Sequence, residues 1–171
     1  MAGVTRRTRL ALLDHVTSPT GLVFPVARIA SRCEDRGIAV MVDGAHAPGM
    51  LDIDVAALGA SYYTGNCHKW LCAPKGAAFL WARRDRLENL RPLAISHGAT
   101  ADTKKRSRFR LEFDWTGTDD PTAFLTVPFA IGFLDELITG GWPALRATLR
   151  ERTLEARRVL ASRLDIPLPC P

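Results

Sequence analysis

The stretch PVARIASRCEDRGIAVMVD, residues 25–43, decides the fold class, because it places an amphipathic helix directly before a buried strand. Apolar residues recur at helical spacing after Pro25, and Gly37 is typical of a helix C-terminus. The run IAVMVD (38–43) is apolar up to its last residue, which predicts a strand buried in a parallel sheet.

The segments on either side continue this pattern. RLALLDHV (9–16) is short, nearly continuously apolar and followed by the turn-forming TSPTG, so we expect another buried strand there. Two strands joined by a helix predict parallel pairing with a right-handed crossover. A short helical piece is expected around residues 55–58, and further strands within residues 60–65 and 76–82. The alternation predicts a doubly wound α/β fold with a mostly parallel sheet.

The C-terminal third reads as helical. Residues 121–141 are mostly apolar and predict one buried helix, capped by Thr118 or Asp119 and kinked at Pro128. Residues 142–164 predict a second helix, in which four apolar side chains share one face between arginines. These are Leu145, Leu149, Val159 and Leu160.

Composition is typical of a globular protein of one ordinary domain. The 171 residues are 47% hydrophobic and 24% charged, with a net charge of +5. Arginines cluster at residues 6–9, 83–86 and 106–110, where they alternate with acids or lie at segment ends. That pattern is typical of solvated faces, and no nucleic-acid-binding motif accompanies it. We therefore expect no nucleic-acid partner.

The four cysteines show no CxxC pairing, so neither a disulfide framework nor a zinc ribbon is indicated. A metal site built from Cys67, His68 and Cys72 lacks a fourth ligand at a recognisable spacing. The N-terminal apolar run is short and contains Asp14 and His15, and no run approaches transmembrane length. We expect a cytoplasmic protein without a metal ion or a membrane association.

Polar side chains gather in three loops that follow predicted strands. The loops are TSPTG (17–21), DGAHAPG (43–49) and GNCHKW (65–70). In open α/β sheets, ligands bind beyond the carboxyl ends of the strands. Each loop alone could be a plain turn, since Asp-Gly is a common turn dipeptide. Their joint occurrence indicates a binding site.

The third loop suggests the chemistry of that site. Lys69 follows a strand between His68 and Trp70, and partial desolvation makes a lysine amine a better nucleophile. Such an amine can hold an aldehyde as a Schiff base. Pyridoxal phosphate is such an aldehyde, and its pyridinium nitrogen requires a carboxylate, which Asp43 could supply from the preceding loop.

The motifs SPTGLVFPV, VMVDGAHAPG and YYTGNCHKWLCAPKGAAFL together resemble the class V aminotransferase family of pyridoxal-phosphate enzymes. The chain is similar in particular to the isopenicillin N epimerase-like branch, over roughly residues 9–163. The resemblance implies the central part of the three-layer, mostly parallel-sheet large domain of fold-type I enzymes, at residues 1–140. Residues 141–171 would be a helix leading toward a small domain.

The resemblance also implies roles for individual residues. Lys69 would form the Schiff base and move protons at the substrate α-carbon, and Asp43 would pair with the pyridinium nitrogen. Further cofactor contacts would come from His46 and Ser18 near the phenolic oxygen and from Asn66 and His68 at the phosphate. Relatives more often carry Asn at position 18 and Ser at position 66. Lys75 precedes a strand and reads as structural.

The run DWTGTDDPTAFL (114–125) resembles the family as well. In relatives its Gly-Thr pair reaches the phosphate of the neighbouring subunit's cofactor, which implies a homodimer and gives Gly117 and Thr118 a role across its interface. A helix N-terminus favours phosphate, so Thr118 could cap a helix and serve this role together.

Family members are about twice as long as this chain, so we expect a partial chain. The resemblance implies a small amino-acid substrate and leaves the reaction open between an epimerase, an aminotransferase and a carbon-sulfur lyase. A cysteine desulfurase is disfavoured, because no cysteine occurs between Cys72 and Cys170 to supply the reactive thiol that those enzymes carry beyond the lysine. The alternative of another class is a non-catalytic remnant or binding module.

Overall fold

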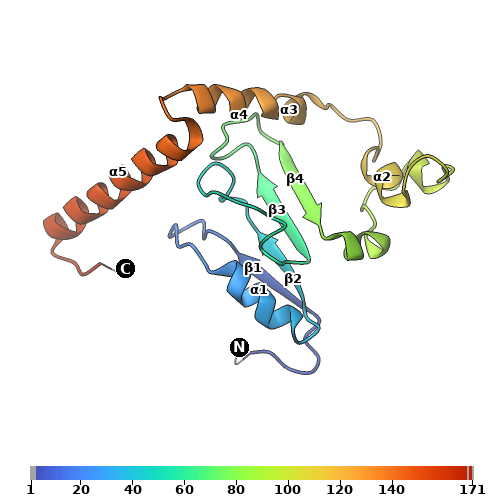
Figure 1. Ribbon diagram of the computed structural model, residues 1–171, viewed down its shortest axis with the longest axis horizontal. Helices are drawn as coiled ribbons and strands as arrows, with labels where there is room; N and C mark the ends of the chain where they lie inside the picture. The colour runs from blue at the N-terminus through green and yellow to red at the C-terminus, as the bar shows by residue number, and fades with distance from the viewer. Residues whose placement is uncertain (1–2, 169, 171) are drawn as a thin grey trace.

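The centre of the computed structural model, which describes residues 3–168 and 170, is a four-stranded sheet (Figure 1). The strands lie in the order β1 (Leu10–Asp14), β2 (Ala39–Asp43), β3 (Tyr62–Asn66) and β4 (Ala78–Ala82). The first three are parallel, and β4 runs antiparallel to β3. The predicted α/β class with a mostly parallel sheet is confirmed.

Helix α1 (Val26–Glu34) connects β1 to β2 and packs on one face of the sheet (Figure 1). The helix ends before Gly37, which has φ +70°, and the Ile38 amide donates to the Cys33 carbonyl at 3.0 Å. Glycine adopts this left-handed conformation without strain, as the sequence predicted. The core between helix and sheet consists of small and medium-sized apolar residues. Its buried members are Val26, Ala30, Cys33, Ile38, Val40, Val42, Ala60 and Tyr63.

Strand β1 lies at the edge of the sheet, and the prediction that it is buried is wrong for one of its faces. Ala11 and Leu13 pack toward the α1 core, whereas Leu10 and Leu12 are 52% and 66% exposed. An apolar run predicts two covered faces only when the same chain supplies a layer for each of them. Within the described residues, α1 supplies the layer on one face.

Residues 55–58 form a turn where the sequence predicted a helical piece. The Asp54 carboxylate accepts the amide hydrogens of Ala56 and Ala57 at 3.0 and 3.1 Å. Such local bonds from an aspartate stabilise a turn in place of a continuing helix.

The single buried helix predicted over residues 121–141 is two helices, α3 (Thr122–Leu125) and α4 (Val127–Glu136), which are covered on one side only. Pro128 lies in the first turn of α4, where its missing N–H removes no helical hydrogen bond. One helix therefore ends before Pro128 and a new one begins there, in place of the predicted kink within a single helix. The Asp120 carboxylate, and not the predicted Thr118 or Asp119, accepts the Thr122 amide at the start of α3. Leu134 of α4 is buried and Val127 packs against a buried cluster around Cys67, whereas Phe129 is 81% exposed.

Helix α5 (Gly141–Leu164) follows and projects away from the sheet (Figure 1). Leu149, Val159 and Leu160 of its predicted apolar face are exposed. Shorter elements lie between β4 and α3. They are the 3-10 helices η1 (Arg84–Asn89) and η2 (His97–Ala99) and the helix α2 (Arg108–Phe113). No helix of the described residues is long and apolar enough to cross a membrane by itself; Thr122–Glu136 and Gly141–Leu164 meet the length and composition only as a pair bent by 71°.

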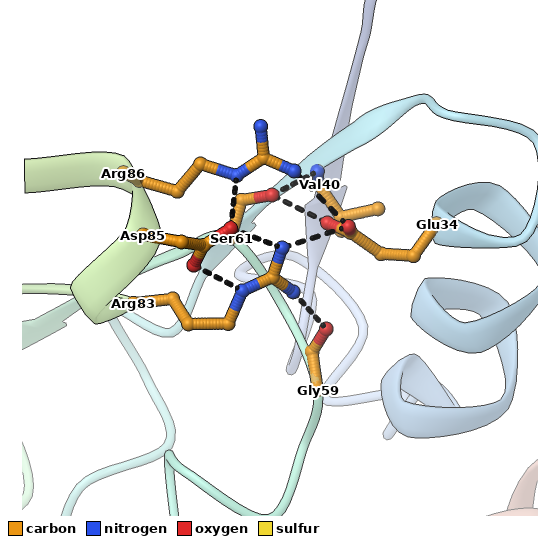
Figure 2. Close-up of polar contacts among 7 residues, drawn as sticks. All are labelled: Glu34, Val40, Gly59, Ser61, Arg83, Asp85 and Arg86. Atoms are coloured by element: carbon orange, nitrogen blue, oxygen red, sulfur yellow. Dashed lines mark hydrogen bonds and ion pairs between the residues drawn. The ribbon is translucent and has the colours of Figure 1, made fainter. Parts of the chain in front are cut away.

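An ionic cluster ties α1 to the sheet at the amino ends of β2 and β3 (Figure 2). The Glu34 carboxylate pairs with Arg83 at 2.9 Å and Arg86 at 3.2 Å and accepts the Ser61 hydroxyl. Burial raises the pKa of Glu34, but the Ser61 and Arg83 hydrogen bonds and the arginine charges hold it below its ordinary value. Arg83 and Arg86 therefore bind this acid and Asp85.

Candidate functional site

The three polar loops leave the sheet at the carboxyl edge of the parallel strands. Asp14, at the end of β1, is the register partner of Asp43, and Asp43 is the partner of Thr64 in β3. The loops also bond to neighbouring strands: the His15 amide donates to the Asp43 carbonyl at 2.8 Å, and the Gly44 amide donates to the Thr64 carbonyl at 2.9 Å. The strand pairing thus brings the DGAHAPG and GNCHKW loops to one edge of the sheet.

Asp43 lies half-buried at this edge. One of its carboxylate oxygens accepts the Ala45 amide hydrogen at 2.9 Å, which fixes the carboxylate within its own turn. The next residue must be small, since a Cβ atom on Gly44 would lie 2.2 Å from the Tyr63 ring. The turn after β2 therefore holds the Asp43 carboxylate in place, and Gly44 leaves room for the Tyr63 ring against the backbone.

Beside this turn, His15 and Tyr63 form a buried pair that the sequence did not reveal. The Tyr63 hydroxyl lies 2.9 Å from His15 Nδ1. Burial, and secondly the negative charge of Asp43, raise the pKa of Tyr63 to about 12, and burial lowers the pKa of His15. Both side chains are thus uncharged at neutral pH. The alternation of side chains along a strand could have predicted that Tyr63, like Val42, lies on the covered face of the sheet. It carries no information on the position of His15.

Lys69, His46 and Trp70 come together in the middle of the site. Lys69 Nζ lies 2.9 Å from His46 Nε2, and the Trp70 indole N–H donates to His46 Nδ1 at 3.3 Å. Lys69 and His46 are half-buried, so the amine is accessible without being fully solvated. The contact joins the two loops whose pairing the sequence suggested.

A glycine allows this close approach of the loops. Gly49 has φ +86°, and a Cβ atom there would lie 2.7 Å from the Trp70 carbonyl oxygen. After Lys69 the backbone turns tightly. The Cys72 amide donates to the Lys69 carbonyl at 3.1 Å, and Cys72 has φ +58°.

The predicted phosphate contacts lie on the same loop. His68 Nδ1 is 3.1 Å from the Ala77 carbonyl oxygen, which can only accept, so Nδ1 donates to that carbonyl. Asn66 ends β3 and is half-buried. Both residues flank the buried Cys67, whose thiol has a raised pKa because of burial, so it is a poor thiolate nucleophile.

The remaining predicted residues lie farther along the edges. Ser18 is exposed in the loop after β1. Gly117 and Thr118 lie in the loop between α2 and α3, which passes outside β4, on the side of the sheet away from β1 (Figure 1). In the described part of the chain, no three histidine, cysteine or acidic side chains are grouped so that they could hold a metal ion.

The aminotransferase class-V family model matches residues 1–137. Isopenicillin N epimerase from Streptomyces clavuligerus is 41% identical over an alignment 175 positions long, which covers 95% of this chain and 43% of that protein. A probable chloroplastic L-cysteine desulfhydrase from Arabidopsis thaliana is 34% identical over 97% of this chain and 34% of its own length. The chain therefore spans less than half the length of these relatives.

Solved structures agree with this match. The apo cysteine desulfurase from Thermococcus onnurineus NA1 superposes with a TM-score of 0.76 at 22% identity, over 95% of this chain and 40% of that one. A variant of the enzyme C-DES, with glycine covalently linked to its pyridoxal-phosphate cofactor, has a TM-score of 0.71 at 25% identity, over 87% of this chain and 40% of that one. Over the matched part, the fold is that of the fold-type I pyridoxal-phosphate enzymes.

Proposed function

Because this chain belongs to the class-V aminotransferase family, we propose that it forms the cofactor-binding part of a pyridoxal-phosphate-dependent enzyme that acts on a small amino acid. One observation carries the proposal: Lys69, on the loop after β3, contacts His46, three residues beyond the carboxylate that ends β2. An amine and a carboxylate on adjacent loops are the two groups that this cofactor requires.

The residues present fit the cofactor by their chemistry. The lysine amine can attach to an aldehyde, and the fixed Asp43 carboxylate can pair with a pyridinium nitrogen. His46 and Ser18 would contact the phenolic oxygen, and Asn66 and His68 the phosphate. When bound, the group withdraws electrons from the substrate α-carbon, so that a proton can be removed there. Lys69, once released, would remove or return that proton.

Two reaction outcomes follow from the same arrangement. Return of the proton to the opposite face of the α-carbon gives an epimerase, and the 41% identity to isopenicillin N epimerase favours this outcome. Loss of a β-substituent instead gives a carbon-sulfur lyase, which the similarity to L-cysteine desulfhydrases supports. The buried thiol of Cys67, with its raised pKa, argues against a desulfurase that uses this cysteine.

The proposal includes a homodimer in the cytoplasm. Gly117 and Thr118 lie in a loop at the periphery of the sheet, which is consistent with a contact to a neighbouring subunit's cofactor. The exposed apolar side chains of α4 are also consistent with a subunit contact.

Reductive labelling tests the proposal. The purified chain is incubated with pyridoxal phosphate, reduced with borohydride and digested, and the modified lysine is identified by mass spectrometry. We expect stoichiometric labelling at Lys69, loss of it in Lys69→Ala, and retention of it in the matched control Lys75→Ala, which removes an exposed lysine of the same loop. Labelling scattered over surface lysines would instead favour a non-catalytic remnant.

A further inference from the structure

An apolar groove lies between α4, α5 and the loops that follow β2 and β3 (Figure 1). It has a volume of about 280 Å³, and its walls include Leu51, Ile53, Leu71, Phe79, Ile131 and Trp142. Of the residues that the structure describes, none of those assigned to the cofactor lines it. Phe79 and Ile131 remain 37% and 40% exposed, so apolar surface in the groove is available for a ligand to bury.

Arg146 places a guanidinium group in this groove, where its side chain is only 21% exposed. Its acidic partner, Asp52, lies at 3.2 Å and is 92% exposed. An ion pair with so solvated an acid contributes little to stability. A guanidinium has five N–H donors and can hold a carboxylate by two parallel hydrogen bonds. A ligand carboxylate can therefore replace Asp52 on Arg146 at small cost.

The first turn of α5 holds Arg146 in this position. Trp142 and Arg146 lie one helical turn apart, on the same face of the helix. The Asp135 carboxylate of α4 accepts the Trp142 amide hydrogen at 3.0 Å, and the Trp142 indole donates to the Ile131 carbonyl at 3.2 Å. These bonds fix the corner between α4 and α5, so the guanidinium is in place before a ligand arrives, which lowers the entropic cost of binding.

We propose that the groove binds a small monocarboxylic acid with an apolar chain, whose carboxylate pairs with Arg146 and whose chain lies against the apolar walls. Charge complementarity selects an anion, because the cation of the groove is largely covered and its present acid is solvated. Apolar pockets with one charged group are typical of small-molecule sites, and drug-sized ligands occupy about 300–1,000 Å³. The smaller volume of this groove suits one short-chain molecule and excludes a helix or strand of a partner protein.

Octanoate and octanol test the two parts of the proposal separately, because they share one alkyl chain and differ in charge. Calorimetry on the full chain at neutral pH measures both affinities and the stoichiometry. We expect one octanoate per chain, with a shift of the Trp142 indole N–H signal in the NMR spectrum of the ¹⁵N-labelled chain. Octanol should bind about tenfold more weakly, since it lacks the charge-assisted hydrogen bond to Arg146.

Two substitutions at the charged end of the groove should change octanoate binding in opposite directions. Arg146→Gln should weaken octanoate binding about tenfold and leave octanol binding unchanged. Asp52→Asn removes the competing carboxylate from a solvated position, so it should strengthen octanoate binding and leave octanol binding unchanged. The matched control is Arg150→Gln, which alters an exposed arginine of the same helix and should change neither affinity.

Several results would overturn the proposal. Equal affinities for octanoate and octanol in the unaltered chain would do so, as would octanoate binding that Arg146→Gln and Asp52→Asn both leave unchanged. Uptake of many octanoate molecules per chain would show adsorption on other exposed apolar surfaces, such as that around Phe129. Octanoate binding that falls as the protein concentration rises would show that a second copy covers the groove. Because the assays contain no pyridoxal phosphate, a failure of cofactor binding would leave each result interpretable.

Discussion

The Tyr63 hydroxyl lies 2.9 Å from His15 Nδ1 and packs against Gly44, the residue that follows Asp43. The pair joins the end of β1 to β3 beneath the turn of the intervening strand. A buried hydrogen bond in this position supports the turn that holds the Asp43 carboxylate.

Removal of the Tyr63 hydroxyl should destabilise the chain. Tyr63→Phe leaves the buried His15 without this partner, and an unsatisfied buried polar group costs about 1–3 kcal/mol. The free energy of unfolding in urea measures the loss. Tyr62→Phe is the matched control, since Tyr62 is half-buried on the opposite face of the same strand. Equal stability of the two variants would show that the pair contributes nothing specific.

The glycine after Asp43 should not tolerate a side chain. Gly44→Ala places a Cβ atom 2.2 Å from Tyr63, so the ring or the turn must move, at a cost of about 1–3 kcal/mol. We expect lower stability in urea and weaker labelling of Lys69 by pyridoxal phosphate and borohydride. Gly132→Ala is the control, because it lies within α4 with no heavy atom within 4 Å of its added Cβ. A stable, fully labelled Gly44→Ala would contradict this account of the turn.

The Glu34 cluster should make stability depend on pH. The folded state holds the pKa of Glu34 below its ordinary value of 4.5, so its contribution is present above that value and is lost as the pH falls through the lower folded pKa. Unfolding free energies measured from about pH 7 to about pH 3 should therefore fall more steeply in the unaltered chain than in Glu34→Gln. Glu88→Gln, which alters an exposed acid of η1, should retain the steep decrease.

The two cysteines of the lysine loop should differ in reactivity. Cys67 is buried with a raised pKa, whereas Cys72 is exposed. Since the thiolate is the species that reacts, iodoacetamide at about pH 8 should modify Cys72 well before Cys67. Peptide mass spectrometry over time measures both sites. After addition of urea the two rates should converge, and faster modification of Cys67 in the folded chain would contradict the structure.

Local patterns predicted those parts of the fold whose partners lie nearby in sequence. The apolar runs of β2 and β3 predict strands by themselves, and the glycine after α1 predicts the end of a helix. The parallel sheet, and with it the meeting of two loops, could be predicted from these local patterns. The prediction of a helix at residues 55–58 was wrong because the Asp54 carboxylate accepts two backbone amides there. These bonds stabilise a turn, which over so few residues is favoured over a helix.

Burial was predicted less well than strand or helix type. Apolar residues in β1 and α4 predicted covered surfaces, but coverage depends on which other layers are present, and periodicity does not report that. Within the site, the pairing of His15 with Tyr63 and the contact of Trp70 with His46 depend on distances between separate segments of the chain. No sequence spacing encodes those distances.

The ionic cluster of Glu34 and the lysine loop lie at opposite ends of the same strands (Figures 1 and 2). Strands of five residues, at about 3.3 Å per residue, separate the two ends by more than the reach of direct side-chain coupling. An engineer could therefore strengthen the cluster and, in the same chain, redesign the loops for a different substrate. The effects of the two sets of substitutions on the free energy of unfolding should be additive, so stability gained at the cluster would offset stability lost at the loops.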